Sequence, residues 1–312
     1  MTILETVDGC THAPTAAAEL RRQLVSQELT FLMEAHDGMS ARVASRAGFD
    51  ALWASGLSMS TALGVRDSDE ATWTQLLDVV AHMSHAADVP ILVDGDTGYG
   101  SFNTARRFAD KARRVGAAGI CLEDKQFPKM NSFVGDSHRL ADVADHVAKL
   151  RACRDVVGDD LVVVARTEAL IVGAGMTEAL DRAEAYREAG ADALFIHSRR
   201  ADVDEIAEFV GEWGGRLPVV IAPTTYAATT PTERFREMGI SSVIWANHSM
   251  RAALRAMQHA CRQIRARESV TDLGVELAPL ADVFELFDYD ELEATERALS
   301  AATPTGRAGS TR

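Results

Sequence analysis

Short apolar runs alternate with amphipathic stretches along most of the chain. The runs have the length and polar boundaries of buried strands, whereas the stretches between them repeat apolar residues at helical spacing. Eight runs predict strands: Thr30–Ala35, Ala51–Ala54, Ile91–Val93, Gly119–Leu122, Leu161–Ala165, Ala193–Ile196, Pro218–Ala222 and Ser242–Ala246. Eight stretches predict helices: Ser40–Ala47, Trp73–His85, Thr104–Val115, Leu140–Val156, Thr177–Ala189, Val203–Trp213, Pro231–Met238 and Met250–Ala266. Four of these helices end near a glycine that suits a helix C-cap: Gly48, Gly116, Gly190 and Gly239.

Eight strands that are each followed by a helix predict an α/β fold, a closed (β/α)8 barrel of the TIM type. A doubly wound open sheet is the alternative, but the turn His36–Met39 lacks the glycine fingerprint of a dinucleotide fold. We expect residues 19–300 to form a single barrel domain with C-terminal helices, residues 1–18 a flexible arm, and residues 301–312 a disordered tail. Past the eighth unit, Val283–Leu299 predicts one more amphipathic helix, whose apolar stripe could be buried on a partner subunit.

The composition excludes several classes of protein. The net charge of −14 argues against broad binding to nucleic acid or to an anionic membrane. The N-terminal residues carry no secretory signal pattern, and no apolar run approaches the roughly 20 residues of a membrane helix. The four cysteines show no metal-ligand spacing. We therefore expect a cytoplasmic protein.

Polar or ionisable residues follow all eight apolar runs, at the ends where a barrel places its reactive groups. The run Ile91–Val93 leads directly into Asp94, Asp96 and a glycine-rich turn. Two such carboxylates about 4 Å apart repel by roughly 4 kcal/mol at an effective dielectric of 20, so a cation between them would stabilise the pair. An isolated pair is more often a solvated loop, but Glu123 on the next strand completes a trio of oxygen ligands suited to Mg²⁺.

Other residue types at these ends indicate a small, highly charged anionic substrate. Arg166 offers a planar fork for phosphate or carboxylate, and His197 could donate a proton or a hydrogen bond, although a lone histidine is more often structural. Ser55–Leu57 could be a small turn whose backbone N–H groups hold an oxyanion, or only a tight turn. The polar segment Glu123–Phe133 resembles a mobile lid that brings Lys129 and Asn131 over the site; alone, it would fit a surface loop equally well.

Five segments together resemble the phosphoenolpyruvate mutase family of the isocitrate lyase superfamily: Leu52–Leu57, Asp94–Gly100, Glu123–Ser132, Ala165–Glu168 and Trp245–His248. The resemblance implies a Mg²⁺-dependent interconversion of phosphoenolpyruvate and phosphonopyruvate. It also implies a modified barrel whose last helix is exchanged between subunits of a homodimer or homotetramer, and a downstream enzyme that consumes phosphonopyruvate.

The resemblance also assigns roles to individual residues. Asp94 would contact the metal, and Asp96 and Glu123 would act largely through metal-bound water. The pyruvyl side of the substrate would be lined by Trp53, Ser55, Gly56 and Leu57. The phosphoryl side would be held by Arg166, Asn131 and His197, with Lys129 on the lid and Asp67 nearby.

Related activities are the main alternatives. Phosphonopyruvate hydrolases carry a threonine-containing lid, so Asn131 favours a mutase, and carboxyphosphoenolpyruvate mutases differ mainly in substrate. The lyases place a cysteine base on this loop, whereas Lys129–Phe133 contains no cysteine. A non-catalytic barrel that binds a small anion is a more distant alternative.

Overall fold

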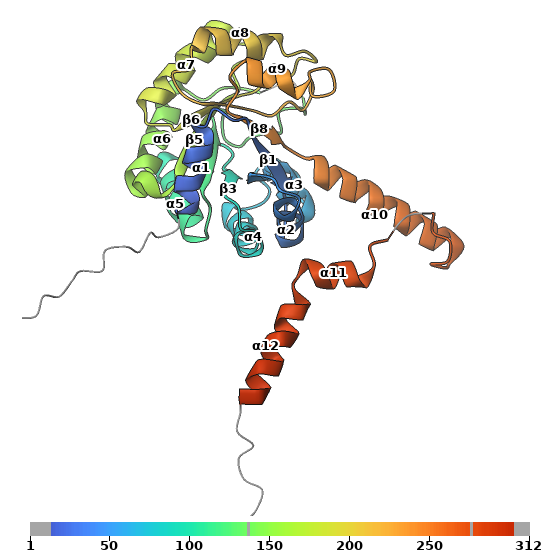
Figure 1. Ribbon diagram of the computed structural model, residues 1–312. Coiled ribbons are helices and arrows are strands. Elements are labelled where there is room, and N and C mark those ends of the chain that lie inside the picture. The colour runs from blue at the N-terminus through green and yellow to red at the C-terminus, as the bar shows by residue number, and fades with distance from the viewer. Residues whose placement is uncertain (1–13, 136–137, 275–276, 303–312) are drawn as a thin grey trace, which may run out of the picture. The chain divides into compact units, whose positions relative to one another are not determined.

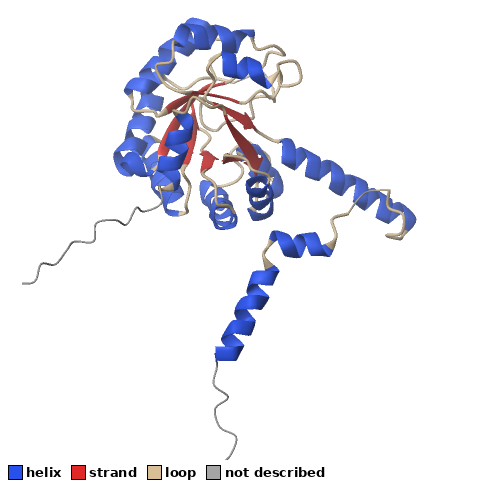
Figure 2. Ribbon diagram, in the orientation of Figure 1, coloured by secondary structure: helices blue, strands red, loops and turns tan. Residues whose placement is uncertain are grey.

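The computed structural model describes residues 14–135, 138–274 and 277–302. Its core is a closed barrel of eight parallel strands that pair in chain order, with β8 against β1 (Figures 1 and 2). The predicted (β/α)8 barrel is therefore confirmed, and every strand lies within two residues of its predicted bounds. The strands are β1 (Thr30–Ala35), β2 (Ala51–Ala54), β3 (Ile91–Asp94), β4 (Gly119–Glu123), β5 (Val162–Thr167), β6 (Ala193–Ile196), β7 (Val219–Ile221) and β8 (Ser242–Trp245).

Helices surround the barrel and follow its strands (Figure 2). All eight predicted helices are present: α2 (Gly38–Arg46), α4 (Trp73–Ala86), α5 (Phe102–Arg114), α6 (Val143–Val157), α7 (Met176–Glu188), α8 (Asp204–Trp213), α9 (Thr232–Glu237) and α10 (His248–Arg267). The sequence did not predict α1 (Ala16–Leu24), α3 (Gly56–Ala62) or the 3-10 turn η1 (Gly158–Asp160). The single helix predicted over Val283–Leu299 is wrong, because α11 (Leu280–Leu286) and α12 (Tyr289–Ala302) are separated at Asp288, whose φ is +55°.

Side-chain alternation along the strands sets what the barrel interior contains. On β5, Val163 and Ala165 pack in the layer beneath the helices, whereas Val162 and Val164 belong to the inner core. By the same period of two, Arg166 continues the inward-facing row at the carboxyl end of the strand. The top of the interior is therefore polar where the lower layers are apolar.

Helix α1 packs across the amino-terminal end of the barrel. Its Leu20 and Leu24 join the inner core, and Gln23 Nε2 donates to the carbonyl of Asp50, which precedes β2 (2.9 Å). Gly119 leaves room for this contact, because a Cβ there would lie 2.9 Å from Leu20 Cδ2. Residues 16–18, which we expected to belong to the arm, form the first turn of α1, while residues 1–13 of that arm lie outside the described residues.

The chain divides into two compact units, residues 1–252 and 253–312. The prediction of one domain over residues 19–300 stays a prediction, as does that of a tail over 301–312, of which 303–312 lie outside the described residues. In the described part of the second unit, Leu273 is the one buried residue. None of the described helices is both long enough and apolar enough to cross a lipid bilayer.

His146 on α6 predicts a specific loss of stability in acid. The side chain is fully buried against the Tyr186 ring, neither ring nitrogen has a hydrogen-bond partner, and burial lowers its pKa to about 3. Because unfolding returns the pKa to 6.5, the unfolded state binds the extra proton between these values. Acidification from pH 7 to pH 5 should therefore cost about 2 kcal/mol of folding free energy at this residue.

Urea unfolding of His146→Leu at the two pH values checks this expectation. The variant should lose less stability on acidification than the wild type, and His82→Leu on the exposed face of α4 controls for removal of a histidine as such. Equal pH dependence of wild type and His146→Leu would contradict the assignment.

Candidate active site

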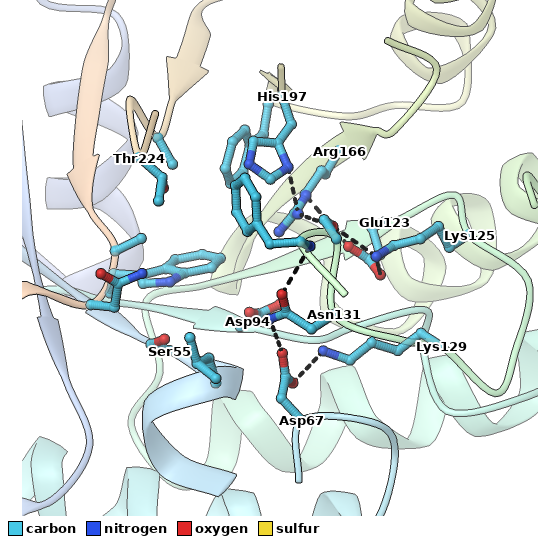
Figure 3. A pocket seen from close by; sticks show the side chains of 18 residues that line it. Ser55, Asp67, Asp94, Glu123, Lys125, Lys129, Asn131, Arg166, His197 and Thr224 are labelled. Carbon is cyan, nitrogen blue, oxygen red and sulfur yellow. Dashed lines mark hydrogen bonds and ion pairs between the residues drawn. The ribbon is translucent and has the colours of Figure 1, made fainter. Parts of the chain in front are cut away.

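A small pocket lies at the carboxyl ends of the strands, where polar side chains from several strands and loops converge (Figure 3). Its cavity volume of about 70 Å³ corresponds to about two water molecules, far below the size of a drug-binding pocket. The pocket is lined by ten of the twelve predicted site residues: Trp53, Ser55, Leu57, Asp67, Asp94, Glu123, Lys129, Asn131, Arg166 and His197. The other two, Gly56 and Asp96, touch the carboxylate of Asp94 or lie beside it.

Asp94 and Asp96 converge on the start of α3. A Cβ added to Gly56 would lie 3.0 Å from Asp94 Oδ2 and 3.2 Å from Asp96 Oδ1, so a larger residue here would have to displace the two carboxylates by a few tenths of an ångström. The expected turn at Ser55–Leu57 is instead the first turn of α3, with Ser55 as its N-cap. The Gly56 N–H donates to Asp94 Oδ2 (3.2 Å) in this structure.

The turn after β3 has a strained backbone that aims these side chains. Asp96 has φ +47° and Tyr99 has φ +57°, in the left-handed region that L residues rarely adopt. Such conformations cost about 1–3 kcal/mol each and persist where the surroundings impose them, often at functional sites. Here this backbone conformation places Asp96 beside Asp94 at the carboxyl end of the barrel.

Burial raises the pKa of Asp94 and, more strongly, that of Asp96, and the neighbouring lysine opposes the effect. Lys129 Nζ lies 2.7 Å from Asp96 Oδ1 and also pairs with Asp67. Burial lowers the pKa of Lys129, but the charges of Asp96 and Asp67 outweigh it and hold that pKa well above its ordinary value. Lys129 is therefore a fixed cation in the acidic part of the pocket.

The oxygen atoms of this cluster fit a hard divalent cation. Among the described residues no three acidic, histidine or cysteine groups are gathered around a single ion position. Lysine ammonium groups lie against two of the carboxylates. Asp96 Oδ1 and Glu123 Oε1 are buried, and the ammonium groups of Lys129 (2.7 Å) and Lys125 (3.2 Å) face them. Together with Asp94 they provide oxygen donors of the kind that Mg²⁺ prefers.

The segment predicted to be a lid, Glu123–Phe133, contributes several of the side chains that line the pocket. Asn131 Nδ2 donates to Asp67 Oδ2 (2.6 Å), and the backbone N–H of Lys129 donates to Asp69. Lys125 Nζ donates to the carbonyl of Met130 (2.8 Å) from the base of the lid. The structure thus brings Lys129 and Asn131 over the site, as the sequence led us to expect.

Arg166 and His197 share a buried carboxylate on the opposite wall. Glu168 Oε1 lies 2.6 Å from Arg166 Nε and 2.9 Å from His197 Nδ1, and Arg166 Nη2 lies 2.8 Å from the same Nδ1. Burial works against ionisation of Glu168, but the charge of Arg166 outweighs it and holds the pKa well below its usual range. Burial lowers the pKa of His197, so the imidazole is neutral at pH 7.

Sequence reasoning missed several residues of this wall. Ser132 Oγ donates to Glu168 Oε2 (2.6 Å), Lys125 Nζ lies 3.2 Å from Glu123 Oε1, and the Phe133 ring packs edge-on against His197 (5.5 Å between centroids). Glu168 lies beside Arg166 at a predicted strand end, within Ala165–Glu168, but the sequence assigned it no role. The others could not be predicted, because their partners are set by the conformation of the lid.

Glu168 is itself held by a second buried carboxylate. Asp124 accepts hydrogen bonds from the backbone N–H of Glu168 (2.8 Å), from Thr167 Oγ1 (2.9 Å) and from Tyr186 Oη (2.7 Å). These contacts fix the backbone just after β5. The orientation of Arg166 therefore depends on residues that lie behind the pocket wall.

Comparisons with known proteins agree with this site. Residues 20–265 match the family model described as phosphoenolpyruvate phosphomutase. The phosphoenolpyruvate phosphomutase of Streptomyces hygroscopicus is 58% identical over 290 residues, 92% of each chain. A crystal structure of phosphoenolpyruvate phosphomutase from Streptomyces platensis subsp. rosaceus is similar at TM-score 0.87 and 37% identity, over 90% of this chain and 98% of the other.

A phosphonopyruvate hydrolase solved with oxalate and Mg²⁺ is similar at TM-score 0.84 and 32% identity, over 91% of this chain and 99% of the other. Both the family model and the 58% identity extend over most of the chain. The resemblance noted in the sequence is thereby confirmed, and the chain belongs to the phosphoenolpyruvate phosphomutase family of the isocitrate lyase superfamily.

Proposed function

We propose that this chain interconverts phosphoenolpyruvate and phosphonopyruvate by moving a phosphoryl group between the enolate oxygen and C3 of pyruvate. The similarity to proteins named phosphoenolpyruvate phosphomutase supports the proposal. The structural observation that carries it is that hydrogen-bond donors line two sides of the same cavity. Lys129 and Asn131 on the lid close onto Asp67, and Arg166 and His197 stand in the wall of the same small cavity.

This arrangement suits a loose, metaphosphate-like transition state, which asks for positioning and charge stabilisation rather than a strong nucleophile. The P–O bond breaks with its electron pair left on the enolate oxygen, and C3 then supplies the pair that forms the P–C bond. Arg166 and the Asn131 amide would hold the phosphoryl oxygens during the transfer. The neutral His197, whose Nδ1 lies within hydrogen-bond distance of both Arg166 and Glu168, would turn its Nε2 toward the phosphoryl group.

Trp53, Ser55 and Leu57 would hold the pyruvyl group from the other side of the pocket. Mg²⁺ is the cofactor that we propose, held by Asp94, Asp96 and Glu123, and when bound it would supply positive charge beside the enolate oxygens. The closed lid would exclude water, which otherwise captures the phosphoryl group and yields pyruvate and phosphate. Water exclusion would thus favour transfer of the phosphoryl group to C3 over hydrolysis.

The direct test follows phosphonopyruvate with Mg²⁺ by ³¹P NMR. We expect its resonance to be replaced by that of phosphoenolpyruvate. Exclusive formation of inorganic phosphate would identify a phosphonopyruvate hydrolase instead, and an unchanged spectrum would favour a barrel that only binds a small anion. Carboxyphosphoenolpyruvate as a second substrate separates the remaining relative.

We further propose a cytoplasmic homodimer or homotetramer that works beside an enzyme that consumes phosphonopyruvate. The equilibrium is expected to favour phosphoenolpyruvate, with its P–O bond, over phosphonopyruvate, with its P–C bond. Removal of phosphonopyruvate by a second enzyme would therefore be needed to draw the reaction toward the P–C bond. An assembly is supported by the many apolar side chains that the C-terminal helices expose, including Met257, Leu280, Phe284 and Leu299. Burial of these residues against another copy, as in an exchanged helix, would remove them from water.

A further inference from the structure

The side chains of Lys125, at the base of the lid, and of Arg199, outside it, hold the backbone of residues 126–135 in place. Within the segment 126–135, Val134 N donates to Asn131 O (3.0 Å) and Phe133 N donates to Asn131 Oδ1 (3.0 Å). Three carbonyl oxygens of the segment, those of Met130, Ser132 and Gly135, accept from the side chains of Lys125 or Arg199. An irregular segment of this kind keeps one conformation only as long as such partners satisfy its backbone.

Arg199 contacts two separate carbonyl oxygens of this segment. Its Nε donates to the carbonyl of Ser132 (2.7 Å), its Nη2 donates to the same oxygen, and Nη2 also reaches the carbonyl of Gly135 (3.2 Å). The planar guanidinium therefore joins two carbonyls three residues apart. Charge-assisted hydrogen bonds are about twice as strong as neutral ones, which favours this contact with the two carbonyls.

The loop that carries Arg199 is itself firmly supported. Ser198 Oγ donates to Glu205 Oε2 on α8 (2.5 Å), and Thr225 Oγ1 donates to the carbonyl of Arg200 (2.6 Å). The same loop begins with His197 in the pocket wall, two residues before Arg199. The Arg199 guanidinium thus connects the lid to a well-supported loop that follows β6.

Ser132, which Arg199 grips, lies at the centre of the closed lid. Its hydroxyl points inward to Glu168, whereas its carbonyl faces Arg199. Its neighbours are the two residues that shut the pocket, Asn131 against Asp67 and Phe133 against His197. Arg199 is not among the residues that line the cavity, so it acts on the substrate only through the lid.

We propose that Arg199 is a positioning residue that latches the lid shut and thereby sets how often the phosphoryl group is lost to water. The product partition in this proposal rests on the proposed mutase function, whereas the latching itself does not. Loss of the latch should favour lid opening by about tenfold or more, as expected for charge-assisted hydrogen bonds.

The test compares Arg199→Ala with Arg200→Ala, which removes an exposed neighbouring arginine that pairs with Asp202. The first readout is the rate of tryptic cleavage after Lys129 in the presence of Mg²⁺ and oxalate. The second is the ratio of inorganic phosphate to phosphoenolpyruvate formed from phosphonopyruvate, followed by ³¹P NMR. We expect both to rise about tenfold or more in Arg199→Ala and to stay at the wild-type values in Arg200→Ala.

Arg199→Lys keeps the charge but cannot bind two carbonyls as a planar fork, so it should fall between Arg199→Ala and the wild type. This variant also carries the test if circular dichroism shows that Arg199→Ala is unfolded. Lid cleavage at the wild-type rate in the folded Arg199 variants would overturn the latch. If the wild type forms no phosphoenolpyruvate, the proposed function fails, while the cleavage rates still decide the role of Arg199.

Discussion

Asp94→Ala is expected to lower the turnover of phosphonopyruvate by at least about a thousandfold, because the charge stabilisation that a bound metal gives amounts to several kcal/mol. The carboxylate lies at the end of β3, faces the cavity and approaches both Asp96 and the backbone of Gly56. Its removal takes away the ligand that we assign to direct metal contact. Steady-state turnover by ³¹P NMR and calorimetric titration with Mg²⁺ measure the two consequences together.

Two further variants separate charge from shape. Asp94→Asn keeps the size of the side chain and an oxygen that can accept from the Gly56 N–H, but it lacks the charge that attracts the metal, so it should also bind Mg²⁺ poorly. Asp110→Ala removes an aspartate that is paired with Arg113 and Arg114 on the outside of α5, and it should leave both measurements unchanged. Full Mg²⁺-dependent turnover in Asp94→Ala would refute the metal assignment.

Glu168→Gln is expected to reduce both activity and stability, although Glu168 does not line the cavity. The glutamine keeps the shape of the side chain but leaves the buried charge of Arg166 with the more distant Glu123 as partner (3.4 Å). Removing one member of a buried ion pair costs about 3–5 kcal/mol of folding free energy. We also expect at least about a hundredfold loss in kcat, since Arg166 and His197 would lose the group that orients them.

Urea unfolding and kcat are the two measurements for this variant. Glu178→Gln is a matched control, because Glu178 also pairs with an arginine (Arg182, 2.7 Å) but is 40% exposed; its loss should cost at most about 1 kcal/mol. Removing both charges in Arg166→Met/Glu168→Gln should destabilise the fold by less than the sum of the single changes. Additive costs in that cycle would show that the two side chains do not depend on each other.

The barrel could be predicted from the sequence because its strands and helices are each indicated by residues that are neighbours along the chain. Eight apolar runs of strand length alternate with helical periodicity, and the glycines that end four of the helices adopt the positive φ expected of a C-cap: Gly48, Gly116, Gly190 and Gly239. Three site carboxylates and Arg166 could be located for the same reason, since they follow directly on apolar strands. Their convergence needed only the rule that parallel strand ends meet at one face.

The misses have physical causes of a different kind. Helix α1 contains few large apolar residues, and its stability comes from packing Leu20 and Leu24 into a barrel that only tertiary structure creates. The break before α12 depends on one backbone angle, at Asp288. The contacts of the lid join residues far apart in sequence, such as Lys129 with Asp67 and Arg199 with Ser132, and no periodicity records such pairs.

Among the described residues, α1 packs across the amino-terminal end of the barrel, opposite the candidate active site. Leu20 and Leu24 fill the base among inward-facing side chains, and Ser241 Oγ ties the end of the helix to the barrel through the carbonyl of Leu24 (2.5 Å). Substrate would therefore enter and product would leave at the opposite, carboxyl-terminal end. The same end would also have to retain the reactive enolate. A change that closes this end more tightly against water should also slow product release. A smaller loss of phosphoryl groups to hydrolysis would then be accompanied by slower turnover.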